Sequence, residues 1–494
     1  MRPMRPLALT LLAALCLLGC DAPVQPLATP PGAPPADAEE PTSTATTESS
    51  TSTTTTTTPT TTDYVTTDPA DLPPGLAWIR SNQPFISGLA THVGAPPLGE
   101  VNRYYDDFHA TATHLWITGL PFEAEAWAAA NHPDFRWLSW IEADGINPHT
   151  GTGVGDYPVT PGRIGYQIWD EPRNLDDVDA MMVGVDRVRQ NDPDGLVVVN
   201  FGNADESISE RDLYEYALQV LDPDVIAYDY YSSSHGEYER AGLIRELGLA
   251  NDVPYWRYID SFGDYGRHEP SHQDLRWGAL LGLVYGFSGH TWFLYETDPG
   301  TAAVVYTTLF DNVGSWAHSP NALFWTAAGL NQELETYART VNLLTSTDIR
   351  YIPETVLYMP DDTLPWSVGA GGDPWLTAVE GIHEGFLETQ EWSIGFFEDD
   401  DGEAYFMVQN AAREGADFPL YRPRGDLRLG FDFGGAPPNV DSTRLTRLDA
   451  ATGAVVDVPL TWLGGTEAEL EWTLDAGDVL LLKYATGAPF AQMP

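Results

Sequence analysis

The sequence predicts an α/β fold: a (β/α)8 TIM barrel over residues 73–348, followed by a C-terminal antiparallel β-sandwich over residues 349–494. Two patterns support this prediction. From about residue 84 to Glu296, short β-branched and aromatic runs alternate with stretches of helical periodicity, which is typical of parallel strands joined by helices. In the last third the runs follow one another without helices, and Asp401-Gly402 and Thr452-Gly453 occur where hairpin turns belong.

Eight runs in the first half have the length and composition of barrel strands. A doubly wound open sheet is the alternative arrangement. It requires a glycine-rich phosphate loop after the first strand, and the segment GLATHVGAPPLGE does not have that pattern. The expected strands are Phe85–His92, His114–Thr118, Phe135–Glu142, Ile164–Glu171, Leu196–Phe201, Val225–Tyr231, Tyr255–Ser261 and Thr291–Glu296.

Helical segments fit between most of these strands. Two of them begin with the spacing of a capping box, because Ser209 is followed by Asp212 and Ser271 by Asp274, each three residues later. The third connection, residues 143–163, is rich in glycine and proline, and we expect it to be a long loop without a helix.

Residues 1–20 have the pattern of a bacterial export signal, with two arginines before an apolar run that is too short for a normal transmembrane helix. The run ends in Leu-Leu-Gly-Cys20, which resembles a lipobox and implies lipidation of Cys20. Cleavage nearby as an ordinary signal peptide is the alternative. Residues 21–72 are rich in Thr, Pro and Ser and predict a disordered linker. We therefore expect a protein that is lipid-anchored in the bacterial cell envelope, at the outer membrane or the cell surface.

The composition limits the partners of this protein. It has 24 Lys and Arg against 72 Asp and Glu, and a net charge of −48. Such a surface repels nucleic acid and anionic lipid, so we expect no nucleic-acid partner and membrane contact through the anchor only. Both cysteines lie in the signal segment, and no H-E-x-x-H or phosphate-loop pattern is present. We expect no metal and no organic cofactor.

Acidic residues end five of the eight expected strands. The C-terminal ends of the strands of a (β/α)8 barrel meet at one rim, where the chemistry of such proteins takes place. In a very acidic chain, any single acid can simply cap a helix or pair with an arginine. The prediction of a functional site therefore rests on all of these acids taken together. The acids are Glu142 on strand three, Asp170 and Glu171 on strand four, Asp229 on strand six, Asp260 on strand seven and Glu296 on strand eight.

Aromatic residues accompany these acids, and the combination is typical of a carbohydrate site. Sugar rings stack their C–H faces on aromatic rings, and carboxylates accept hydrogen bonds from sugar hydroxyls. Hydrolysis of a glycosidic bond requires two carboxyl groups. Glu171 follows the apolar pair Ile168-Trp169, which favours the raised pKa of a general acid. Asn200 has two possible roles, as a residue that binds sugar hydroxyls or as a turn residue. The expected substrate contacts are Asp170, Asp229, Tyr231, Trp292, Glu142, Asn200 and Trp256.

Two segments carry a family resemblance. GYQIWDEP and DVIAYDYYSSS resemble motifs of the β-galactosidase-like and related (β/α)8 glycoside hydrolases of clan A, over residues 80–486. The resemblance implies that Glu171 is the acid/base. Asp170 replaces the asparagine that usually precedes that glutamate, and Asp260 replaces the nucleophilic glutamate that ends strand seven. Glu296 is then the alternative second carboxylate.

Two functions are compatible with these observations. The first is a surface-tethered glycoside hydrolase that acts through two carboxyl groups on an oligo- or polysaccharide. The second is a non-catalytic carbohydrate-binding lipoprotein on a degenerate glycosidase barrel, which the replacements at Asp170 and Asp260 favour.

Overall fold

The computed structural model describes residues 67–91, 115–118, 122–131, 133–134, 136–148, 151–156, 159–231, 236–264, 269–297, 305–311, 320–353, 359–360, 363–382, 391–412 and 424–493. The predicted signal with Cys20, and the linker up to residue 66, lie outside these residues. No helix within the described ranges is long and apolar enough to cross a membrane.

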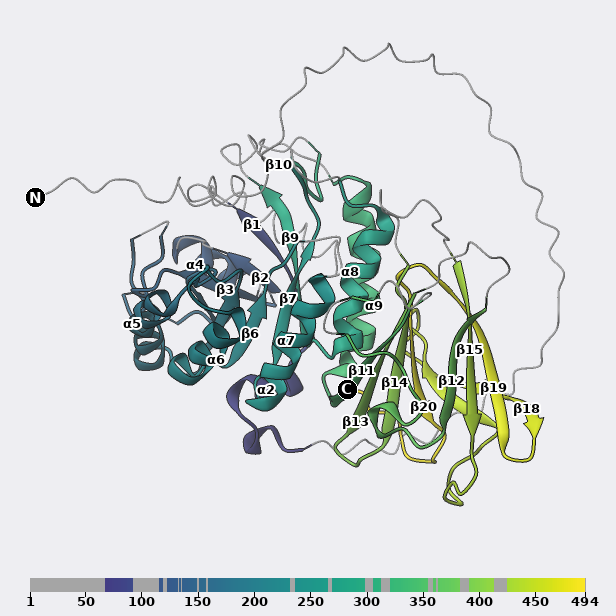
Figure 1. Ribbon diagram of the computed structural model, residues 1–494. Coiled ribbons are helices and arrows are strands. Elements are labelled where there is room, and N and C mark those ends of the chain that lie inside the picture. The colour runs from purple at the N-terminus through teal and green to yellow at the C-terminus, as the bar shows by residue number, and fades with distance from the viewer. Residues whose placement is uncertain are drawn as a thin grey trace, which may run out of the picture. The chain divides into compact units, whose positions relative to one another are not determined.

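Eight parallel strands close into a barrel, as predicted (Figure 1). Consecutive strands pair with one another, and β1 pairs with β9 to complete the circle, with Phe85 opposite Gly289 and Ser87 opposite Thr291. The strands are β1 (Phe85–Thr91), β2 (Leu115–Thr118), β3 (Arg136–Ile141), β4 (Arg163–Ile168), β5 (Leu196–Phe201), β6 (Val225–Tyr228), β7 (Tyr255–Asp260) and β9 (Gly289–Thr297).

Helices connect most of these strands. Ser271 and Asp274 form the predicted capping box at the start of α8, and the Ser209 side chain caps α6 by accepting from the Asp212 N–H. The described part of the connection between β3 and β4 contains no helix, which confirms the prediction of a loop there. The helices are α2 (Pro74–Ser81), α4 (Phe122–Asn131), α5 (Leu175–Asn191), α6 (Glu210–Leu221), α7 (Gly236–Ala250), α8 (His272–Tyr285) and α9 (Ala322–Val341).

Aromatic rings fill the end of the barrel at which the strands begin. Phe85 stacks on Trp256 with ring centroids 3.8 Å apart, and Trp78 of α2 packs against the same indole at 6.1 Å. Both Phe85 and Trp256 are almost fully buried. Because this end is packed solid, the rim where the strands finish is the part of the barrel open to chemistry.

A small two-stranded antiparallel sheet has no counterpart in the sequence prediction. It joins β8 (Gly263–Asp264) to β10 (Val305–Thr307). Its strands have two and three residues. Such strands are too short to produce a recognisable alternation of apolar and polar residues.

The second half forms two antiparallel sheets, which confirms the predicted sandwich class. Trp392, Phe406, Phe431 and Tyr484 belong to the buried cluster that these sheets share. One sheet has the order β11-β13-β14-β20-β16-β17 and the other β12-β15-β19-β18. Their strands are β11 (Leu344–Ile352), β12 (Leu376–Ile382), β13 (Trp392–Asp399), β14 (Ala404–Asn410), β15 (Arg424–Asp432), β16 (Arg444–Leu448), β17 (Val455–Pro459), β18 (Thr461–Gly464), β19 (Glu467–Asp475) and β20 (Val479–Tyr484).

The two predicted hairpin turns are present. Gly402 joins β13 to β14 with φ of 77°, and Gly453 joins β16 to β17 with φ of 68°. Both values lie in the left-handed region, which glycine adopts without a steric penalty.

Helix α8 packs directly against two sandwich strands. The Gln409 side chain of β14 donates a hydrogen bond to the Trp277 carbonyl at 3.2 Å. On β13, Gly395 approaches α8 so closely that an added Cβ would lie 2.0 Å from the Val284 carbonyl oxygen. The absence of a side chain at this position therefore permits the contact between barrel helix and sandwich.

We predict that Gly395→Ala lowers the free energy of unfolding by about 1–3 kcal/mol, because backbone must move to admit the methyl group. Urea unfolding monitored by tryptophan fluorescence measures the change. Gly329→Ala is the matched control, because an added Cβ there meets no atom within 4 Å. Equal stabilities of the two variants would show that the close approach on α8 does not constrain the fold.

Candidate functional site

The chain turns sharply where β4 ends. The prediction that this strand continues to Glu171 is wrong, since β4 ends at Ile168. Trp169 and Glu171 instead adopt left-handed backbone with φ of 53° and 49°. Such conformations cost on the order of 1 kcal/mol each for residues other than glycine and persist only where surrounding contacts enforce them.

Neighbouring strands supply those contacts. The Trp169 N–H donates to the Ile141 carbonyl of β3 at 2.7 Å, and the Glu171 N–H donates to the Asn200 carbonyl of β5 at 3.2 Å. The strands on both sides therefore fix the turn. It places Asp170 and Glu171 beside each other at the C-terminal rim of the barrel.

The Asp170 carboxylate is held by amide groups from two strands. Its Oδ1 accepts hydrogen bonds from Asn200 Nδ2 at 2.9 Å and from Gln167 Nε2 at 3.2 Å. Tyr258 of β7 in turn donates its hydroxyl to Gln167 Oε1 at 2.6 Å. This network crosses the barrel interior and fixes the orientation of Asp170.

Sequence reasoning did not assign Gln167 to the site. Gln167 is fully buried on a strand whose other residues are mostly apolar, and it precedes Asp170 by three positions. A buried amide in such a strand needs a hydrogen-bonding partner, so its position was the available signal.

The Glu171 side chain occupies space that Gly202 leaves open. A Cβ at position 202 would lie 2.5 Å from Glu171 Cδ. Gly202 is itself fixed, because its carbonyl accepts from the Tyr214 hydroxyl at 2.6 Å and from Arg240 at 3.2 Å. An ion pair with Arg173, at 3.6 Å, lies on the more exposed side of Glu171.

Asp229 approaches Glu171 from β6. Its N–H donates to the Phe201 carbonyl at 3.1 Å. Its carboxyl lies close enough to Glu171 and Tyr231 for both groups to affect its pKa. Tyr231 stacks on Phe293 of β9 with ring centroids 4.8 Å apart. Asp229 therefore lies between the acids that follow β4 and the aromatic pair Tyr231 and Phe293.

The pKa values of three acids at this rim, Asp170, Asp229 and Glu142, are raised. Burial, followed by the charge of Glu171, raises the pKa of Asp170 to about 7. Burial and the charges of Glu171 and Asp170 raise the pKa of Asp229 well above its usual range. Burial and neighbouring Asp144 also raise the pKa of Glu142, which follows β3. Near neutral pH this group of carboxyls therefore retains protons that it can give up or take back.

The structure gives fewer contacts for the two candidate second carboxylates, Asp260 and Glu296. Asp260 ends β7, and its Oδ1 accepts a long hydrogen bond from the Phe262 N–H at 3.4 Å. Glu296 lies in β9 opposite Ala90 of β1, and its side chain is outside the described residues. Both backbones belong to the C-terminal halves of their strands.

Two predicted substrate contacts lie elsewhere. Trp256 is the second residue of β7, so it belongs to the closed end of the barrel, where it stacks on Phe85. Trp292 is fully buried on the helix-facing side of β9 and donates from Nε1 to Asn331 of α9 at 2.7 Å. Both are core residues. The half-buried aromatics at the rim are instead Trp140, Trp169, Tyr231 and Phe293.

No group of three or more His, Cys, Asp or Glu side chains is arranged to hold a metal ion within the part of the chain that the structure describes. The site offers instead proton-sharing carboxyls, neutral amides and aromatic faces. This set is suited to binding hydroxyl-rich molecules and to transferring protons.

We predict that Asp170→Asn stabilises the fold above neutral pH. The pKa of about 7 in the folded chain exceeds the ordinary 3.8, so the folded state binds a proton that the unfolded state releases. The free energy of unfolding contributed by Asp170 is therefore largest below about pH 4, falls as the pH rises to about 7 and stays low above it.

Replacing Asp170 with asparagine, which does not titrate, removes this loss of stability at high pH. At about pH 8 we expect the free energy of unfolding of Asp170→Asn to exceed that of the wild type by about 1–2 kcal/mol. At about pH 4 we expect the two values to be nearly equal. Denaturant titrations at both pH values measure the effect. Asp186→Asn, on the exposed face of α5, controls for the removal of one negative charge. Equal effects at the two pH values would contradict the argument.

No family model matches this sequence, and no curated protein matches it. Solved structures with a similar fold include a glycoside hydrolase of family 5 from Bacteroides vulgatus, at 10% identity and a TM-score of 0.46, covering 83% of this chain and 91% of that one. A second, described as a glycoside hydrolase, has 10% identity and a TM-score of 0.45, covering 82% of this chain and 94% of the other.

A β-galactosidase from Bacillus circulans has 8% identity and a TM-score of 0.43, covering 82% of this chain and 99% of that one. These neighbours are glycoside hydrolases, and their likeness to this chain concerns the fold alone. Its chemistry must therefore be argued from its own residues.

Proposed function

We propose that this protein is a surface-tethered glycoside hydrolase that acts on an oligo- or polysaccharide, with Glu171 as its general acid/base. The observation that carries the proposal is the group formed by Asp170, Glu171 and Asp229 at the C-terminal rim. Protonating a glycosidic oxygen near neutral pH requires a carboxyl that still carries a proton at that pH, and the raised pKa values of Asp170 and Asp229 keep protons within this group.

Glu171 is suited to the acid/base role by its surroundings. Its carboxyl lies beside that of Asp229, whose raised pKa keeps a proton within the same group of acids. In the first step Glu171 gives its proton to the leaving oxygen as the bond to the anomeric carbon breaks. Asp260 is the proposed second carboxylate, either attacking the anomeric carbon or activating water, and Glu296 is the alternative.

Binding of the sugar ring is assigned to the aromatic surface at the rim. Tyr231 and Phe293 are stacked with an interplanar angle of 16°, and both rings are half-buried at the rim. Asn200, Asp170 and Glu142 provide acceptors and donors for hydroxyls around them.

The tether remains a proposal from the sequence. Lipidation of Cys20 would anchor the protein in the bacterial cell envelope, and the Thr-rich linker would hold the catalytic body away from the membrane. Incorporation of labelled palmitate into the wild type, and its loss in Cys20→Ser, tests the anchor independently of the activity.

A glycan-binding protein without activity is the second candidate. The ion pair between Arg173 and Glu171, at 3.6 Å, favours it, because it engages the carboxyl that must reach the substrate. Hydrolysis assays separate this candidate from the enzyme.

We predict that the soluble body hydrolyses at least one member of a polysaccharide panel, and that Glu171→Gln lowers the rate by about 100-fold or more. Reducing-end release measured at low and high salt tests this. Glu206→Gln, an exposed acid in the loop after β5, is the control for a lost carboxylate. Glycan binding without cleavage, equal in wild type and Glu171→Gln, would replace the enzyme with the binding protein.

We predict that Gly202→Ala moves the Glu171 side chain and lowers activity while changing the stability of the fold only slightly. The new methyl group collides with the end of a flexible side chain, so we expect Glu171 to move and the free energy of unfolding to fall by less than about 1 kcal/mol. Hydrolysis should fall by about 10-fold or more, because a displacement of about 1 Å at the reacting groups has effects of that size. Full activity in a stable Gly202→Ala variant would show that this packing does not position the acid/base.

A further inference from the structure

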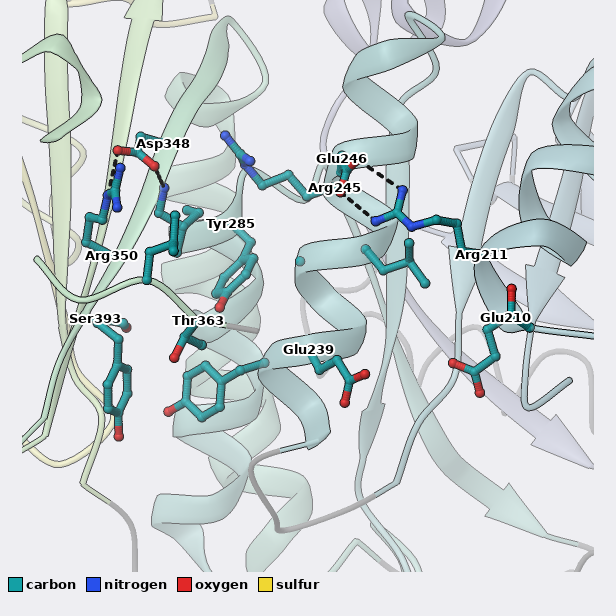
Figure 2. Close-up of a pocket in the computed structure, with 17 residues that line it drawn as sticks. Glu210, Arg211, Glu239, Arg245, Glu246, Tyr285, Asp348, Arg350, Thr363 and Ser393 are labelled. Carbon is teal, nitrogen blue, oxygen red and sulfur yellow. Dashed lines mark hydrogen bonds and ion pairs between the residues drawn. The ribbon is translucent and has the colours of Figure 1, made fainter. Parts of the chain in front are cut away.

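A second hollow lies away from the rim, between α6 and α7 of the barrel and β11 and β13 of the sandwich. Its volume is about 670 Å³, within the range of about 300–1,000 Å³ common for small-molecule sites. Figure 2 shows side chains from all these elements directed into one space. None of the acids assigned to the candidate active site lines it.

The charges that line this hollow nearly cancel. Arg211, Arg245 and Arg350 stand against Glu210, Glu239, Glu246 and Asp348, a formal net charge of 3 − 4 = −1. The whole chain carries −48 with only 24 basic residues, so such a balance is unusual on this protein. A nearly neutral lining neither attracts nor repels ions strongly, which favours an uncharged ligand.

Most of these charges are already engaged with each other. Arg211 binds both carboxylate oxygens of Glu246, at 3.0 and 2.7 Å. Arg350 pairs with Asp348 at 2.7 Å. These pairs present hydrogen-bonding atoms that can bind hydroxyl groups. Glu239 forms no ion pair with a described residue and is exposed at the edge of the hollow.

Tyr285 provides an independent indication of a ligand. Its side chain is 2% exposed, and Figure 2 shows it projecting from α8 into the hollow. Its hydroxyl makes no hydrogen bond to another described residue. This hydroxyl is therefore available to a ligand that enters the hollow. Leu243 and Ile349 add apolar surface to the same walls.

We propose that this hollow is a second, non-catalytic binding site for an uncharged oligosaccharide. Tyrosine and apolar side chains would contact the C–H faces of sugar rings, and the paired carboxylates and guanidiniums would bind the hydroxyls. The choice of a glycan over another neutral polyol rests on the proposed function. The presence of a site rests only on the volume, the charge balance and Tyr285.

The test fills the hollow without touching the active site. Gly242 lines the hollow, and an added Cβ there meets no atom within 4 Å, so Gly242→Phe places its ring in open space. Gly329→Phe on α9 is the matched control, because position 329 is equally open and does not line the hollow. Tyr285→Phe removes only the hydroxyl and serves as a second variant.

The probes are cellohexaose, xylohexaose and maltohexaose, titrated calorimetrically into the full-length chain carrying Glu171→Gln. We expect two binding events per chain for at least one probe. Gly242→Phe should remove one of them, Tyr285→Phe should weaken it about three- to tenfold, and Gly329→Phe should change neither. In the chain with Glu171 intact, Gly242→Phe should leave hydrolysis of a short chromogenic glycoside unchanged.

The outcomes distinguish this site from the proposed enzyme. Hydrolysis with the same number of binding events in Gly242→Phe and Gly329→Phe would overturn the second site and leave the enzyme standing. Loss of an event in Gly242→Phe without hydrolysis by the wild type would support the second site and overturn the enzyme. If no probe binds outside the rim, the proposal is wrong.

Discussion

The left-handed turn at the end of β4 is the constraint on which the candidate site depends. Neither Trp169 nor Glu171 favours this backbone, so the turn exists because β3 and β5 bond to it from both sides. Those bonds require the closed barrel, in which each strand has two neighbours. An open edge at β4 would leave one side of the turn unsupported, and Asp170 and Glu171 would no longer be held together. The long-range pairing of strands therefore determines the local chemistry.

Holding acids together in a buried place opposes the stability of the fold. Burial raises the pKa of Asp170 to about 7, and that of Asp229 further above its usual range, so the folded chain keeps protons at the site that exposed carboxyls would lose. Elsewhere, buried acids such as Glu125 and Glu237 are paired with the arginines Arg163 and Arg257. At the rim, Asp170 and Asp229 have raised pKa values without a full ion pair to any described residue, so they can hold and transfer a proton.

The sequence predicted the elements of this fold better than the contacts of its site. Runs of β-branched and aromatic residues indicated all eight barrel strands, and alternation with helices indicated their parallel order. The turn at Trp169 was missed because hydrogen bonds from other strands impose it and local preference does not. Trp292 was misplaced because the side on which a residue of β9 faces depends on strand register. Trp256 was misplaced for a simpler reason, since it begins its strand and so belongs to the opposite end of the barrel.

Arg240 connects the two parts of the molecule to which functions are assigned. It donates to the Gly202 carbonyl at 3.2 Å, beside Glu171, and to Glu210 at 2.5 Å, on the wall of the second hollow. Its guanidinium also lies over the Tyr230 ring at 5.0 Å. A buried cation with several partners holds them in one arrangement, because the loss of any partner leaves part of its charge uncompensated. Glu210 therefore helps to fix Gly202, and through it the space that Glu171 occupies, although no ligand in the second hollow need touch the acids at the rim.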